Sequence, residues 1–156
     1  PESGLVFGGS GNYGGGGTRP TEKEAKFFGF DPKKKQKVFE AVLVPGARNY
    51  PATVAVDGKV FTTVGDKLFV FDPASRRVTK SLTLPGAQLE ISLGLHSSGR
   101  LIGLTGNAVY LVDPKREEIS ETWEAPVPIS CGFALVEGAV YFGSKAELWR
   151  CRLGPR

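Results

Sequence analysis

The sequence contains few of the side chains that most often bind metals or act as nucleophiles. Among 156 residues there are one histidine, His96, and two cysteines, Cys131 and Cys151. One histidine excludes a multi-histidine metal site, and two cysteines in separate strand contexts do not form a metal-ligand pair. We expect both cysteines to be buried free thiols, because a disulfide would require their strands to bring the two sulfur atoms within bonding distance.

Helical periodicity and long apolar runs are also lacking. Nowhere do apolar residues recur at intervals of three and four over a dozen positions, so no amphipathic helix is expected. No apolar run reaches about eighteen residues, which excludes a helical membrane span, and no signal peptide is recognisable. The chain begins with Pro1 rather than methionine, which leaves room for a natural N-terminus and a targeting signal upstream.

Charge of one sign does not dominate the chain. Its 20 basic and 16 acidic side chains give a formal net charge of +4. Nucleic-acid surfaces gather basic residues on one face, whereas the densest basic run here, Lys33 to Lys37, falls in a turn between two expected strands. We therefore expect solvated hairpin tips and no nucleic-acid partner.

A repeated strand pattern organises the sequence. The stretch Lys59 to Pro73, KVFTTVGDKLFVFDP, contains two runs rich in β-branched and aromatic residues, joined by Gly65-Asp66. The pattern returns in Arg100 to Pro114 after a shift of 41 residues, and Phe27 to Pro32 lies 41 residues before Leu68 to Pro73. A degenerate copy starts at Ala139, after a step of 39.

A period of about 40 residues that contains only strand signals is typical of β-propeller blades. We predict one all-β domain over residues 1–156, with about four antiparallel blades of four strands each, the first and last incomplete. The strand counts are three, four, four and three, which favours an open arc from a ring of six to eight blades. The expected blades cover residues 4–46 with an inserted loop at 10–25, then 52–84, 91–123 and 131–153.

The blades should bury their faces against each other. The first strand of each internal blade, Thr53 to Val56 or Ile91 to Leu95, is expected to line the channel. The second and third strands should fill the core between blades. The predicted core residues are Phe61, Phe69, Phe71, Leu101, Tyr110 and Val112. The outer faces of the first and last blades stay uncovered, so the expected partners are remaining blades of the same propeller or another copy of the chain.

Polar loop residues are expected to converge on one face. In a propeller, the loops between the second and third strands and those between blades emerge together around the channel mouth, where function commonly resides. These loops supply side chains suited to an oxygen-rich ligand or to calcium. Ordinary turn formation is the alternative explanation for them. The candidate residues are Asn12, Tyr13, Arg19, Arg48, Asn49, Tyr50, Glu90 and Asn107.

Two further features receive structural explanations. Gly14 to Gly17 could suggest a phosphate-binding loop, but no Lys-Ser/Thr pair follows, and a flexible lid or linker is expected instead. His96 falls in a turn on the face opposite the candidate residues. We expect it to be a turn residue rather than a catalyst.

An apolar hairpin that ends in Phe-Asp-Pro, as in Leu68 to Pro73 and Phe27 to Pro32, resembles a bacterial propeller superfamily. That group includes quinoprotein-like repeats, gluconolactonase and regucalcin, and virginiamycin B lyase-like proteins. The resemblance implies a propeller of six to eight blades, often bacterial and exported. The Gly-His and Trp-Asp pairs of WD40 repeats are absent. Lactonases of the group bind a metal at the channel mouth, where Asn49 and Glu90 are the candidates here.

Two functions remain open at this point. The first is a binding or scaffold module of a larger, exported protein that recognises a carbohydrate-like ligand or a protein on its loop face. It follows from the lack of any histidine, cysteine or carboxylate cluster with catalytic spacing. The alternative is half of a metal-dependent lactonase- or lyase-like enzyme acting on a sugar-derived substrate, with Asn49 and Glu90 in a calcium site.

Overall fold

The computed structural model describes residues 4–13 and 19–152, and this part of the chain is all-β. Its strands are short and separated by turns, as the sequence predicts. They are β1 (Val6–Gly9), β2 (Phe27–Asp31), β3 (Gln36–Ala41), β4 (Thr53–Val56), β5 (Lys59–Val64), β6 (Lys67–Asp72), β7 (Arg77–Thr83), β8 (Gln88–Leu95), β9 (Leu101–Thr105), β10 (Ala108–Asp113), β11 (Glu118–Glu124), β12 (Cys131–Val136), β13 (Ala139–Ser144) and β14 (Glu147–Arg152). Within the described residues, no helix has the length and apolar character needed to cross a membrane.

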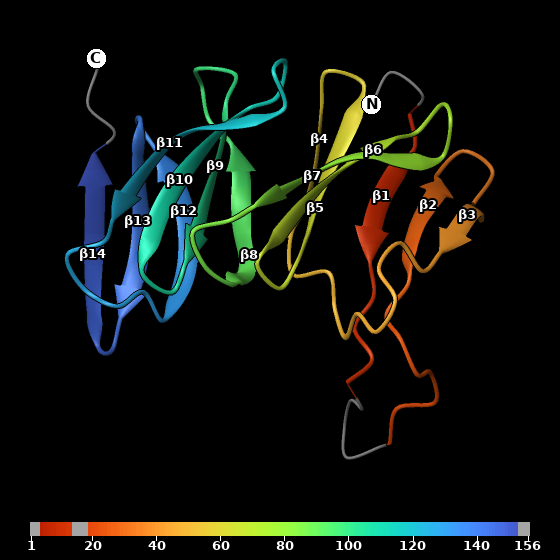
Figure 1. Cartoon of the computed structure of the whole chain (residues 1–156), viewed down its shortest axis with the longest axis horizontal. Helices are drawn as coiled ribbons and strands as arrows, with labels where there is room; N and C mark the ends of the chain where they lie inside the picture. Colours follow the sequence, from red (N-terminus) through yellow and green to blue (C-terminus); the bar gives the residue numbers. More distant parts are fainter. Residues whose placement is uncertain (1–3, 14–18, 153–156) are drawn as a thin grey trace.

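The strands form four antiparallel sheets, each from consecutive strands. Their orders are β1-β2-β3, β4-β5-β6-β7, β8-β9-β10-β11 and β12-β13-β14. We call them sheets one to four. They stand side by side in chain order, from sheet one on the right of Figure 1 to sheet four on the left. The all-β class and the counts of three, four, four and three strands are therefore confirmed.

The repeated Asp-Pro pair has a local structural cause. At the end of β10, Asp113 Oδ1 accepts hydrogen bonds from the backbone N–H groups of Lys115 (2.9 Å) and Arg116 (3.1 Å). Asp31 and Asp72 make the same kind of turn after β2 and β6. The carboxylate satisfies backbone donors at the turn, so this motif builds hairpins rather than a site.

Each internal sheet buries both faces because its side chains alternate. In sheet two, Val60 and Phe71 pack toward sheet one, whereas Phe61 and Leu68 pack toward sheet three. Three apolar cores result, one between each pair of neighbouring sheets. Their most buried large side chains include Phe27 and Phe71 in the first core, Phe61, Leu68, Leu101 and Tyr110 in the second, and Ile102, Leu104, Val140 and Phe142 in the third.

Five of the six predicted core residues are fully buried, and Phe69 differs. Phe69 is only partly buried, whereas Tyr110, 41 residues further on, is completely buried. Sheet two covers Tyr110 and contributes Val70 to that contact. Sheet one covers Phe69, and at the position that corresponds to Val70 it has Gly29. Because glycine adds no side chain, the cover over Phe69 is thinner.

The cysteine prediction is wrong in one respect. Both thiols are free, but Cys131 is exposed and Cys151 only partly buried. Cys131 lies beside Gly143 on the open face of sheet four, whereas Cys151 packs into the core between sheets three and four. The two sulfur atoms are therefore on opposite faces of one sheet.

Candidate functional site

Three chain segments meet at the lower ends of sheets one to three in Figure 1, where β1 ends and β8 begins. Residues 11 and 49 form an isolated antiparallel bridge, and the Asn12 backbone N–H donates to the Arg48 carbonyl at 2.8 Å. On the other side, the Ile91 N–H donates to the Pro51 carbonyl at 2.9 Å. The segment around Asn49 is thus held by backbone bonds between the inserted loop and β8.

Asn49 and Glu90 lie together at this junction. The Asn49 side-chain amide donates to Glu90 Oε1 at 3.4 Å, although the two residues are 41 positions apart. A pocket of about 260 Å³ opens beside them, lined also by Gly9, Gly11, Tyr13 and Ile91. A carboxylate and an amide at its edge supply hydrogen-bond acceptors and donors to anything that enters.

Arg48 and Tyr13 form a second polar contact at the same place. The Arg48 guanidinium carbon lies 5.5 Å from the centre of the Tyr13 ring, within the range of a cation–π interaction. The exposed Tyr13 ring lines the pocket. This contact holds a flat aromatic surface next to a cation.

Asn12 carries an acceptor that no described residue uses. Its Nδ2 donates to the Lys23 carbonyl at 3.0 Å, while its Oδ1 is buried and has no hydrogen-bond partner among residues 4–13 and 19–152. Buried polar atoms are normally hydrogen-bonded, so this oxygen can still accept a donor. It sits on the segment that is bonded to Arg48.

Tyr50 is a structural residue with its hydroxyl already engaged. The ring is 6% exposed, and its hydroxyl accepts from the Leu43 N–H at 3.1 Å. Burial raises the pKa of this phenol, so it stays neutral. A Cβ at Gly9 would lie 2.2 Å from the Tyr50 Cβ. The close approach of these two segments therefore requires glycine at position 9.

Two predicted residues lie outside this group. Asn107 accepts from Thr105 Oγ1 at 3.1 Å within the β9–β10 turn, which is the role of an ordinary turn residue. Arg19 is exposed and does not line the pocket. The predicted lid at Gly14 to Gly17 lies outside the described residues.

Five residues that line the pocket are not among the candidates from the sequence: Gly9, Ser10, Gly11, Pro51 and Ile91. The sequence predicts that Ile91 begins a channel-lining strand, but β8 already begins at Gln88. Ile91 has φ 52° and is 82% exposed. A β-branched residue rarely adopts this conformation. The local sequence does not predict it, because the bulge in β8 depends on how β8 pairs with β9.

A larger pocket lies elsewhere. It has a volume of about 350 Å³ and is formed by turns at the opposite ends of sheets two and three, including Asp57, Arg100 and Lys115. It contains none of the predicted site residues. His96 belongs to one of these turns, where its Nδ1 accepts from the Ser98 backbone N–H at 3.2 Å.

The candidate calcium ligands form a small set. In residues 4–13 and 19–152, no three His, Cys, Asp or Glu side chains are grouped to hold a metal ion. Asn49 and Glu90 together offer few oxygens, whereas calcium takes roughly six to eight oxygen ligands. Hydrogen bonding to a polar ligand fits this pair better.

Comparison of the chain with protein-family models gave no match, and comparison with curated protein sequences gave no significant match.

Proposed function

We propose that the four sheets are successive blades of a β-propeller and that the chain is a binding module for a carbohydrate-like, oxygen-rich ligand at the Asn49–Glu90 pocket. The succession of first strands supports the propeller: β8 contacts both β4 and β12, as innermost strands around a channel would. The spacing of 41, 41 and 39 residues between successive sheets supports it further.

The convergence of three distant segments on one pocket carries the binding proposal. Sugar hydroxyls both donate and accept hydrogen bonds, and planar amide, carboxylate and guanidinium groups can meet them in pairs. Asn49 and Glu90 line the pocket and provide an amide and a carboxylate, and Tyr13 provides an aromatic surface for the apolar face of a sugar ring. Arg48 does not line the pocket itself but places its guanidinium against the Tyr13 ring. The loops are anchored by backbone bonds, so little ordering would accompany binding.

A glycan array carrying neutral and acidic oligosaccharides tests the proposal, followed by calorimetry with the best ligand. Asn49→Ala and Glu90→Ala should each weaken binding by about tenfold or more, since each removes a hydrogen-bonding group at the pocket. Asn107→Ala is the matched control, because it changes the same residue type in a turn outside the pocket. The affinity of the Asn107→Ala chain for the glycan should stay within about twofold of the parent value.

The proposal fails if no glycan binds, or if binding is unaffected by both pocket substitutions. The lactonase- or lyase-like alternative has no observation in its favour beyond the resemblance of the repeats. A calcium titration of the same variants addresses it. Thermal stabilisation by calcium that disappears in Glu90→Ala would revive that alternative.

A further inference from the structure

The four sheets have equivalent residue positions, and these positions show which face of each sheet packs against a neighbouring sheet. Val6, Val60, Leu101 and Val140 correspond, because they pair with Phe30, Phe71, Val112 and Cys151 in their respective hairpins. We define the leading face of a sheet as the face on which these residues lie, which points to the preceding sheet. The trailing face is the opposite one.

The trailing faces are buried in three sheets and open in the fourth. Phe27, Leu68 and Val109 occupy corresponding positions and are at most 2% exposed beneath the next sheet. Leu148, 39 residues after Val109, is 78% exposed. Val136 is half exposed on the same face, whereas its counterpart Val56 packs into the core between sheets two and three.

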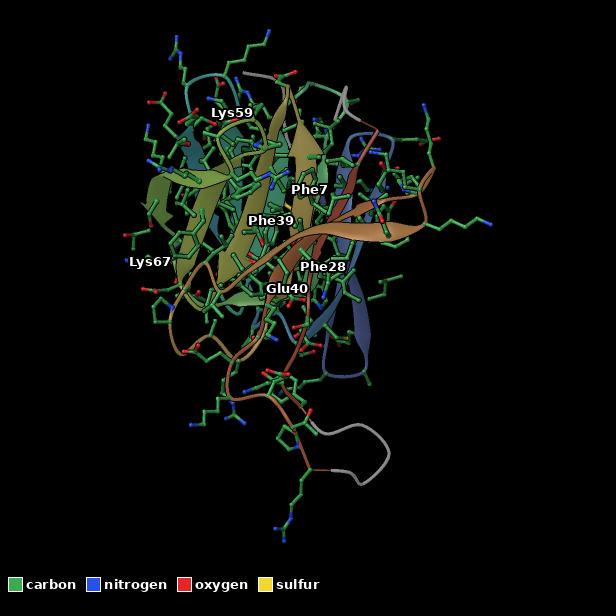
Figure 2. All side chains as sticks on the ribbon, turned by 90° about the vertical axis from the view of Figure 1, so that its right-hand side faces the viewer. Phe7, Phe28, Phe39, Glu40, Lys59 and Lys67 are labelled. Atoms are coloured by element: carbon green, nitrogen blue, oxygen red, sulfur yellow. The ribbon has the colours of Figure 1, made fainter. Side chains whose placement is uncertain are left out.

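The leading faces show the mirror situation. Val60, Leu101 and Val140 are completely buried against the preceding sheet, but Val6 is 56% exposed. Phe28 and Phe30 lie beside Val6 on the same face. Their counterparts are Phe69 and Phe71 in sheet two and Tyr110 and Val112 in sheet three, of which all but Phe69 are fully buried. Figure 2 looks at the molecule from this end, with Phe28 next to its cross-strand partner Glu40.

We infer that the trailing face of sheet four binds the leading face of sheet one of a second copy of this chain. Leu148 and Val136 on one face, and Val6, Phe28 and Phe30 on the other, occupy positions that pack together within the chain, so this contact would continue an existing interface. In the first core, the Phe27 and Phe71 rings lie 5.1 Å apart. The corresponding contact between copies joins Leu148 of one to Phe30 of the other. Glu40 on the leading face is already paired with Lys26 and Lys37, so the contact rests on the apolar positions.

Analytical ultracentrifugation of the chain over a range of concentrations tests this contact. The parent chain should associate beyond its monomer mass of 16.7 kDa. Leu148→Glu and Val6→Glu should each weaken association by about tenfold or more, because each buries an unpaired carboxylate in the contact. Leu95→Glu is the control. Leu95 is 50% exposed, similar to the 56% of Val6, but it lies on neither open face. Its substitution should therefore leave association unchanged.

A mixture distinguishes this arrangement from symmetric ones. Leu148→Glu and Phe30→Lys chains should each be monomeric alone and associate when mixed, since the mixture restores one unaltered contact and pairs opposite charges in the other. A parent chain that stays monomeric at high concentration would overturn the inference. So would association that survives either single substitution, because a symmetric contact uses only one of the two faces.

Discussion

At the scale of single residues, close packing explains positions that carry no functional chemistry. Tyr110 is fully buried in the second core, and its hydroxyl donates to Gln88 Oε1. Gln88 Nε2 in turn donates to the Ser92 carbonyl at 2.9 Å. Burial raises the pKa of Tyr110 far above its ordinary range, so this phenol remains a neutral donor.

Gly103 makes room for that ring. A Cβ at position 103 would lie 2.2 Å from Tyr110 Cζ. Gly103→Ala should therefore displace the ring and lower the free energy of unfolding by about 1–3 kcal/mol, measured by urea denaturation. Gly106→Ala is the control because no atom lies within 4 Å of its added Cβ. Equal effects of the two substitutions would show that the Tyr110 ring is not the cause.

At the scale of elements, the Asp-Pro turns couple folding to pH. Hydrogen bonds from the Ser75 hydroxyl and the Ala74 N–H hold the pKa of Asp72 below its ordinary value of 3.8. The pKa of Asp113 is lowered mainly by the Arg116 N–H, and also by the Lys115 N–H. A carboxyl with a lowered folded pKa stabilises the native state above the unfolded pKa, and this contribution disappears as the pH falls through the folded pKa.

The double variant Asp72→Asn, Asp113→Asn should consequently be less stable than the parent at pH 7. The difference should shrink as the pH falls below about 4, where the parent carboxylates become protonated. Urea midpoints measured between pH 7 and pH 2.5 provide the comparison. If the difference stays constant over this range, the ionised form of these turns does not contribute to stability.

Turns and strands were also the features that sequence predicted best. The apolar runs on either side of Gly65-Asp66 predict the strands β5 and β6. Asp57-Gly58 and Glu137-Gly138 form tight turns with positive φ at both residues. The pocket was predicted less completely. Asn49 and Glu90 were candidates, but their contact depends on how closely Gly9 lets Tyr50 approach and on the bulge around Ile91. Such tertiary contacts leave no pattern in the local sequence.

At the scale of the whole molecule, the four sheets stabilise one another through three apolar cores. Each fully buried large side chain contributes roughly 2 kcal/mol. Sheets two and three are covered on both faces, whereas sheets one and four are covered on one face each. Stability in such stacked arrays depends on contacts with the neighbours. The end sheets should therefore open before the middle ones.

Amide hydrogen exchange, measured sheet by sheet in the Leu148→Glu chain, tests this most directly. That substitution is expected to remove contacts between copies, so any protection reflects the single chain. The backbone N–H groups of β5, β6, β9 and β10 should exchange most slowly, and those of sheets one and four should exchange faster. Uniform protection of all four sheets in a monomer would contradict an array with two uncovered end faces.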